Sequence, residues 1–68
     1  MKVITGRTLC KILEAKGWEL KTIHGSHHIY MKAGRKERIS VPVHSGTDLK
    51  MGLLKSVMKI AEVTEDDL

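Results

Sequence analysis

The chain has few of the residue types that stabilise secreted or membrane-inserted proteins. Its 68 residues include one cysteine, so an internal disulfide cannot form, which fits a reducing compartment. No apolar run approaches the roughly 20 residues that span a bilayer, and the N-terminal segment Met1–Thr5 lacks the apolar stretch of a secretory signal. We therefore expect a cytoplasmic protein that does not enter a membrane.

Aromatic side chains and nucleotide-binding motifs are equally scarce. Trp18 and Tyr30 are the only aromatic residues, which disfavours single-strand RNA binders that stack bases on several rings. A Walker loop, a dinucleotide fingerprint and a Gly-x-Ser-x-Gly elbow are all absent, which argues against the common nucleotide-binding and hydrolase classes. Cys10 lies within a helical pattern, where a buried structural thiol is the better interpretation than a nucleophile.

Acidic residues are rare until the last few positions. Residues 1–61 carry 12 basic and 4 acidic side chains, a net charge of +8, whereas residues 62–68 carry 4 acidic and no basic ones. A body this basic favours a polyanionic partner such as RNA, or an acidic protein. The alternative is a solvated charged surface that serves only solubility.

Hydrophobic spacing predicts a helix near each end of the chain. Over 5–16, Leu9, Ile12 and Leu13 fall on one helical face, with Thr5 as N-cap and Gly17 as the terminating residue. Over 50–61 a second apolar stripe is formed by Leu53, Leu54, Val57, Ile60 and Ala61. Thr64 followed by Asp67 indicates only a short capped turn at the end.

Between the helices the apolar spacing changes to a period of two, which predicts three strands. The first begins at Trp18 and ends before a turn at His24-Gly25-Ser26, and the other two span 27–32 and 38–43. The first has Trp18, Leu20 and Thr22 on its buried side. In the second we expect His27, Ile29 and Met31 to face the helices, with His28, Tyr30 and Lys32 outward. In the third, Ile39, Val41 and Val43 share a face, and Pro42 indicates a free edge.

These elements predict one α+β domain over residues 1–68 in the order α-β-β-β-α. The strands should form one antiparallel sheet, and both helices should pack on the same face of it, since neither helix can bury its apolar stripe alone.

The most informative residues are three histidines around a Gly-Ser turn: His24, His27 and His28. We expect no metal site here, because His27 and His28 point to opposite faces of a strand and no further cysteine or carboxylate pattern completes a tetrahedral shell. Proton transfer fits better, since imidazole can take a proton from a ribose 2′-hydroxyl and return one to a leaving oxygen without a metal or other cofactor. The alternative is a set of solvated turn histidines with no catalytic role.

Basic side chains that bracket the hairpins are candidate RNA contacts. They are Lys21, Lys32, Arg35, Lys36 and Arg38, to which we add Tyr30 and His44. His44 opens the loop His44-Ser45-Gly46-Thr47, where backbone amides at Gly46 and near Lys50 could meet phosphate, although an ordinary strand-to-helix loop is the favoured interpretation.

Four segments, in their order and spacing, resemble the HicA family of bacterial and archaeal toxins. They are Leu13-Glu14-Ala15-Lys16-Gly17-Trp18, Gly25-Ser26-His27-His28-Ile29-Tyr30, Val41-Pro42-Val43-His44 and Leu49-Lys50-Met51-Gly52-Leu53-Leu54-Lys55-Ser56-Val57. The resemblance covers nearly the whole chain. It departs from the usual pattern in Ala61-Glu62, where the family commonly has Ala-Gly, and in a second hairpin without proline.

The resemblance implies a double-stranded-RNA-binding-domain-like fold and an mRNA interferase that a HicB-type antitoxin neutralises by covering the active site. The essential histidine of the family directly follows the Gly-Ser pair, which places the catalytic site at Gly25, Ser26 and His27, with His28 as the substitute candidate. A non-catalytic RNA-binding module with the same basic body remains the main alternative.

Overall fold

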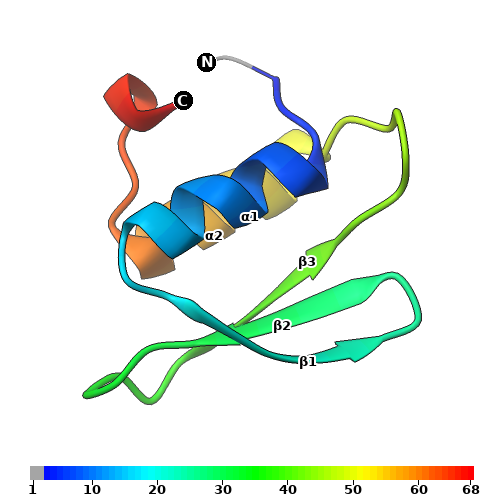
Figure 1. The fold of residues 1–68 in the computed structure, drawn as a ribbon. Coiled ribbons are helices and arrows are strands. Elements are labelled where there is room, and N and C mark those ends of the chain that lie inside the picture. Colours follow the sequence, from blue (N-terminus) through cyan, green and yellow to red (C-terminus); the bar gives the residue numbers. More distant parts are fainter. Residues whose placement is uncertain (1–2) are drawn as a thin grey trace.

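The elements follow one another in the predicted order α-β-β-β-α, with both helices on one side of a three-stranded antiparallel sheet (Figure 1). The computed structural model describes residues 3–68, so the first two residues of the N-terminal segment considered above, Met1 and Lys2, lie outside the described residues. The elements are α1 (Gly6–Ala15), β1 (Glu19–His24), β2 (His27–Met31), β3 (Arg38–Pro42), α2 (Met51–Ala61) and the 3₁₀ turn η1 (Glu65–Asp67). The strand order is β1-β2-β3. We call the two sides of the sheet the helix-facing side and the open face.

The ends of α1 are as the sequence predicts. The Thr5 hydroxyl accepts a hydrogen bond from the Thr8 amide at 3.2 Å, and Gly17 has a φ of +96° just beyond the last helical turn. α2 ends differently, because Glu62 itself takes the left-handed conformation, with a φ of 59°. This is the position where the sequence departs from the Ala-Gly pattern.

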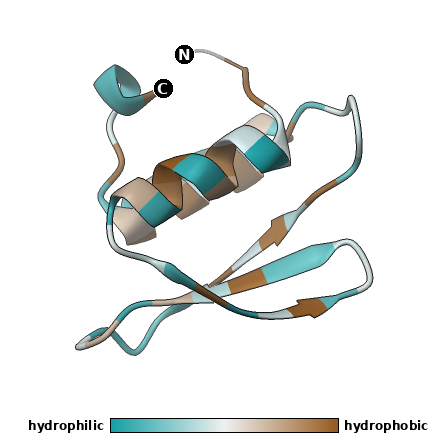
Figure 2. Cartoon of the chain, viewed as in Figure 1, coloured by the Kyte–Doolittle hydropathy of each residue, from teal (hydrophilic) through white to brown (hydrophobic). Residues whose placement is uncertain are grey.

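The core lies between the helices and the helix-facing side of the sheet. Its fully buried members are Leu9, Leu13, Trp18, Tyr30, Ile39, Val41 and Leu54. Hydrophobic and hydrophilic segments alternate along the helices, as expected for helices with one buried face (Figure 2). No helix within residues 3–68 has both the length and the apolar character needed to cross a bilayer.

The predicted orientation of β2 is wrong. Tyr30 is 1% exposed and pairs with the buried Ile39, so Tyr30 and His28 lie on the helix-facing side. His27, Ile29 and Met31 therefore lie on the open face, because side chains alternate along a strand. Side chains alternate along β2 as the sequence predicts, but both faces of this strand carry apolar residues, and only the position of the helices decides which face is buried.

The predicted half-buried first strand is also wrong. All six residues of β1 are exposed, and Trp18, which is buried, precedes the strand. A bulge interrupts the ladder between Leu20 and Thr22, so Leu20 pairs with Tyr30 on the helix-facing side, whereas Thr22 pairs with Ile29 on the open face. β1 is an edge strand that the helices do not cover, and Leu20 remains 41% exposed.

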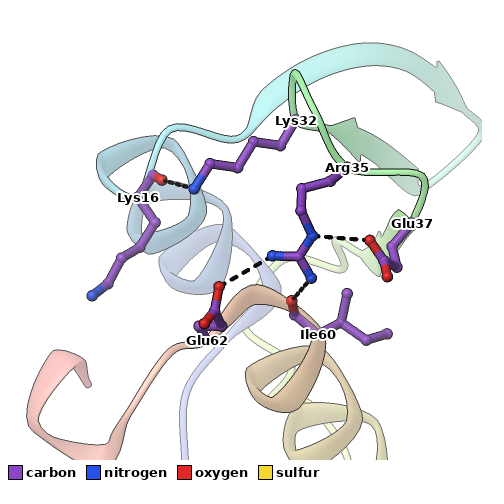
Figure 3. Close-up of polar contacts among 6 residues, drawn as sticks. All are labelled: Lys16, Lys32, Arg35, Glu37, Ile60 and Glu62. Carbon is purple, nitrogen blue, oxygen red and sulfur yellow. Dashed lines mark hydrogen bonds and ion pairs between the residues drawn. The ribbon is translucent and has the colours of Figure 1, made fainter.

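The β2–β3 loop is tied to the C-terminal ends of both helices (Figure 3). Lys32 Nζ donates to the Lys16 carbonyl at 2.9 Å, and Arg35 Nη2 donates to the Ile60 carbonyl at 3.0 Å. Arg35 also forms ion pairs with Glu37 at 3.0 Å and with Glu62 at 3.1 Å. Cations at these positions meet helix carbonyls that lack an intrahelical partner, where the helix dipole favours positive charge.

Candidate active site

The Gly25-Ser26 pair forms a two-residue hairpin turn between β1 and β2. Gly25 has a φ of +60° and Ser26 does not have a positive φ, which is the pattern of a type II′ turn that begins with glycine. The strand residues that flank the turn, His24 and His27, are partners in the ladder. The turn therefore sets the register that brings these two histidines together.

His27 lies on the open face with its side chain exposed to solvent. Among residues 3–68, the side chain within hydrogen-bonding distance of this ring is that of Ser40 on β3, whose Oγ is 3.4 Å from His27 Nδ1. If the hydroxyl accepts from Nδ1–H, the second nitrogen, Nε2, is left unprotonated and can act as a base. The arrangement provides an accessible imidazole with one nitrogen oriented by a neighbouring strand.

His44 is close to the same turn. Its Nε2 lies 3.4 Å from Ser26 Oγ, and the backbone amide of Val43 donates to the Ser26 carbonyl at 2.7 Å. These contacts join the β1–β2 turn to the chain that leaves β3. His44 also lines a mostly apolar hollow of about 380 Å³ that extends to Lys50 at the start of α2. Ser26 and His44 are thus brought together, as two members of the predicted site.

His28 is separated from this group because it lies on the helix-facing side. It is half-buried and lines a hollow of about 400 Å³ between α1 and the sheet, together with Cys10 and Tyr30. The Tyr30 hydroxyl donates to Glu14 Oε2 at 2.7 Å, and burial raises the pKa of Tyr30, with Cys10 and Glu14 adding to the rise. Cys10 is buried, as predicted, and burial raises the pKa of its thiol.

The side chains predicted to bind RNA do not form one cluster around His27. Lys21, Lys36 and Arg38 are exposed, and Lys21 pairs with Glu19 at 3.2 Å. Lys32 and Arg35 hold the helix ends, with cation positions 6.0 and 5.7 Å from the centre of the Trp18 ring. Arg38 and the β2–β3 loop lie at the far end of the hairpin from the Gly25-Ser26 turn.

Two residues near His27 were not among the predicted site residues. Ser40 is 13 positions away in the chain and becomes a neighbour only through the β2–β3 register. The sequence places His24 in the histidine cluster and in the turn but not in the site; a two-residue turn at Gly25-Ser26 is the sequence signal that would pair it with His27. Among residues 3–68, no group of three His, Cys, Asp or Glu side chains has an arrangement that could hold a metal ion.

The fold and the site define a class of small basic α-β-β-β-α proteins that present histidines from a glycine turn at one end of an open sheet face. A comparison with known families identifies the family within this class. The family model described as HicA toxin of bacterial toxin-antitoxin matches residues 6–63, so the chain belongs to the HicA toxin family. No curated protein sequence matches the chain at a significant level.

Proposed function

We propose that this chain is the toxin of a toxin–antitoxin pair and that it cleaves mRNA in the cytoplasm, with His27 as the group that transfers the proton. The observation that carries this proposal is the position of His27. It is exposed on the open face, next to the Gly25-Ser26 turn, and its Nδ1 lies 3.4 Å from Ser40 Oγ. A histidine that served only packing would not need to be solvent-exposed and oriented by a hydroxyl.

The charge distribution supports an RNA substrate. Residues 1–61 have a net charge of +8, which draws a polyanion to the surface by long-range attraction and by release of counterions. Lys21, Lys36 and Arg38 have exposed side chains and are the basic residues of the predicted set that we assign to backbone phosphates. We leave Tyr30 out of the RNA contacts because its ring lies in the core.

In the reaction we propose, His27 Nε2 takes the proton of a ribose 2′-hydroxyl as the 2′-oxygen attacks the adjacent phosphorus. The bond from phosphorus to the 5′-oxygen of the next nucleotide breaks, and that oxygen receives a proton from an imidazolium. The products are an RNA end with a 2′,3′-cyclic phosphate and an RNA end with a free 5′-hydroxyl. Each step uses groups that the chain itself supplies.

The test is to incubate the purified protein with single-stranded RNA in the presence of EDTA and to identify the new ends. We expect cleavage that chelator does not reduce, with a 2′,3′-cyclic phosphate or its hydrolysis product. Activity that disappears with EDTA and returns with a divalent ion would contradict the mechanism. RNA that is bound but stays intact would favour the non-catalytic RNA-binding module.

We further propose that a HicB-type antitoxin neutralises the toxin by covering the open face around His27. Family membership and the exposure of His27 support this proposal. A purified complex with the antitoxin should not cleave RNA, and proteolysis of the antitoxin should restore cleavage.

A further inference from the structure

His24 is placed where a second proton-transfer group would be needed. It is the direct ladder partner of His27, and both side chains are exposed on the open face. Side chains that are directly opposite in an antiparallel pair have Cβ atoms about 5 Å apart. The two imidazoles are therefore close enough to act on one bound phosphate group.

The His24 side chain has no structural task among the described residues. It does not belong to the core, and within residues 3–68 its imidazole makes no hydrogen bond or ion pair. The titratable group opposite it is His27 on β2. His44, beyond β3, contacts Ser26 in the adjoining turn, and Lys21 and Glu19 on the same strand as His24 pair with each other. Both ring nitrogens of His24 are thus free to meet a substrate.

The other two histidines are less suited to the role. His28 lies on the helix-facing side, so the sheet separates it from any phosphate at His27. His44 Nε2 is already within hydrogen-bonding distance of Ser26 Oγ. His24 alone combines the same face as His27, direct pairing with it and an uncommitted ring.

We propose that His24 is the general acid that works with His27 as general base, an inference that rests on the proposed RNA cleavage. Breaking the chain at phosphorus requires one proton to leave the 2′-oxygen and another to reach the departing 5′-oxygen. His27 Nε2 accepts the first proton as the bond from the 2′-oxygen to phosphorus forms. His24, in its protonated form, gives its proton to the 5′-oxygen as the bond from phosphorus to that oxygen breaks. In hydrolysis of the cyclic phosphate, water would give a proton to His24 as its oxygen adds to phosphorus, and His27 would return its proton to the 2′-oxygen. Both rings would then be in their starting states.

The test measures RNA cleavage rate against pH for wild type, His24→Gln and His27→Gln, with Thr22→Ala as the matched control on the same strand and face. The wild-type rate should pass through a maximum, because the base must be unprotonated and the acid protonated. His24→Gln should be slower by about 10²- to 10⁴-fold and should lose the fall in rate at high pH. His27→Gln should be slowed similarly and lose the rise at low pH, and Thr22→Ala should behave as wild type.

Thermal unfolding of each variant checks that the fold is intact. A second variant, His24→Ala, is assayed with free imidazole in solution, which should restore part of the rate and the fall at high pH. His24→Gln with the wild-type rate would overturn the inference, and so would a slower His24→Gln with an unchanged pH profile, because His24 would then act only in binding. If His27→Gln is inactive in those cases, the proposed RNA cleavage stands. If wild type leaves RNA intact, or His27→Gln cuts at the wild-type rate, the proposed function itself fails.

Discussion

Adjacent residues on a strand face opposite sides of a sheet, and in β2 this gives two neighbouring histidines different environments. His27 is exposed on the open face, whereas His28 is half-buried beside α1 and lines a hollow with Cys10 and Tyr30. Sequence alternation separated the two residues correctly but assigned each to the wrong side. With the sides corrected, His27, which directly follows the Gly-Ser pair and which we propose as the proton-transfer group, is the more accessible of the two.

The first prediction compares His27→Ala with His28→Ala. His27→Ala should fold normally, because its side chain is outside the core, but should cut RNA about 10²- to 10⁴-fold more slowly. His28→Ala should keep cutting and should lose about 1 kcal/mol of unfolding free energy, since it removes a half-buried ring. Growth arrest, RNA cleavage and thermal unfolding measure these effects. Loss of cleavage in His28→Ala alone would place the chemistry on the helix-facing side.

Glu62 carries backbone strain that the usual glycine of the family would avoid. Its φ of 59° is in the left-handed region, which costs an L-residue about 1–2 kcal/mol, and its side chain pairs with Arg35. Glu62→Gly relieves the strain, loses the same exposed ion pair and adds some disorder to the unfolded chain, so we expect a gain of up to about 1 kcal/mol. Glu62→Ala keeps the strain and loses the ion pair, so it should be less stable than wild type. Urea denaturation should find Glu62→Gly the most stable, wild type next and Glu62→Ala the least stable. A Glu62→Gly variant less stable than wild type would contradict this explanation.

At the scale of elements, the two connections of the sheet have different tasks. The β1–β2 turn is short and pairs His24 with His27, whereas the β2–β3 loop sends Lys32 and Arg35 back to the helix ends. Two basic residues in a loop can either bind RNA or contact the ends of helices, and the sequence predicts RNA binding. The contacts in Figure 3 assign Lys32 and Arg35 to the second task.

The structural role of the β2–β3 loop can be tested with Arg35→Ala and Lys36→Ala, neighbouring substitutions that each remove one positive charge. Arg35→Ala should lower the melting temperature measurably, because the Ile60 carbonyl and two carboxylates lose their shared donor. Lys36 is exposed, so Lys36→Ala should melt as wild type and should lower RNA affinity and its salt dependence instead. Calorimetry and RNA titrations at several salt concentrations measure both. Equal melting temperatures for the two variants would refute the structural role of Arg35.

At the scale of the whole molecule, the acidic tail packs against the helix side of the basic body, away from the open face. η1 lies on the helix side of the molecule, away from the sheet (Figure 1). Asp67 accepts a hydrogen bond from the Thr64 amide at 2.8 Å and pairs with Lys16 at 3.1 Å. The tail is thus folded onto the end of α1, and its negative charge does not cover the open face where His27 lies.

The tail contact should make stability depend on pH. The bond from the Thr64 amide, together with Lys16, lowers the pKa of the Asp67 carboxyl in the folded state. The stabilisation is therefore fully present above the pKa that the Asp67 carboxyl has in the unfolded chain. It is lost as the pH falls through the lower pKa of this carboxyl in the folded protein. Asp67→Asn should melt below wild type at neutral pH, and the difference should disappear in strong acid. A difference that stays constant across this range would show that the carboxylate charge plays no part.

The sequence by itself determined the identity and order of the elements, the N-cap of α1 at Thr5, the end of α1 before Gly17 and a glycine turn just before His27. These features depend on local physics. Apolar spacing, side-chain capping and the backbone freedom of glycine act over a few neighbouring residues, so they can be read along the chain. The same local patterns place His24 in the turn, whereas in the structure it is the last residue of β1 and the ladder partner of His27.

Only the tertiary structure decided which side of the sheet is buried, which cations are free and which side chains meet at the site. Tyr30 and Ile29 are both apolar enough for a core, and the choice between them depends on where two distant helices pack. Ser40 contacts His27 because of the β2–β3 register, and Arg35 contacts the Ile60 carbonyl 25 positions further along the chain. Such contacts join residues far apart in the chain, and their energies depend on packing that no local pattern encodes.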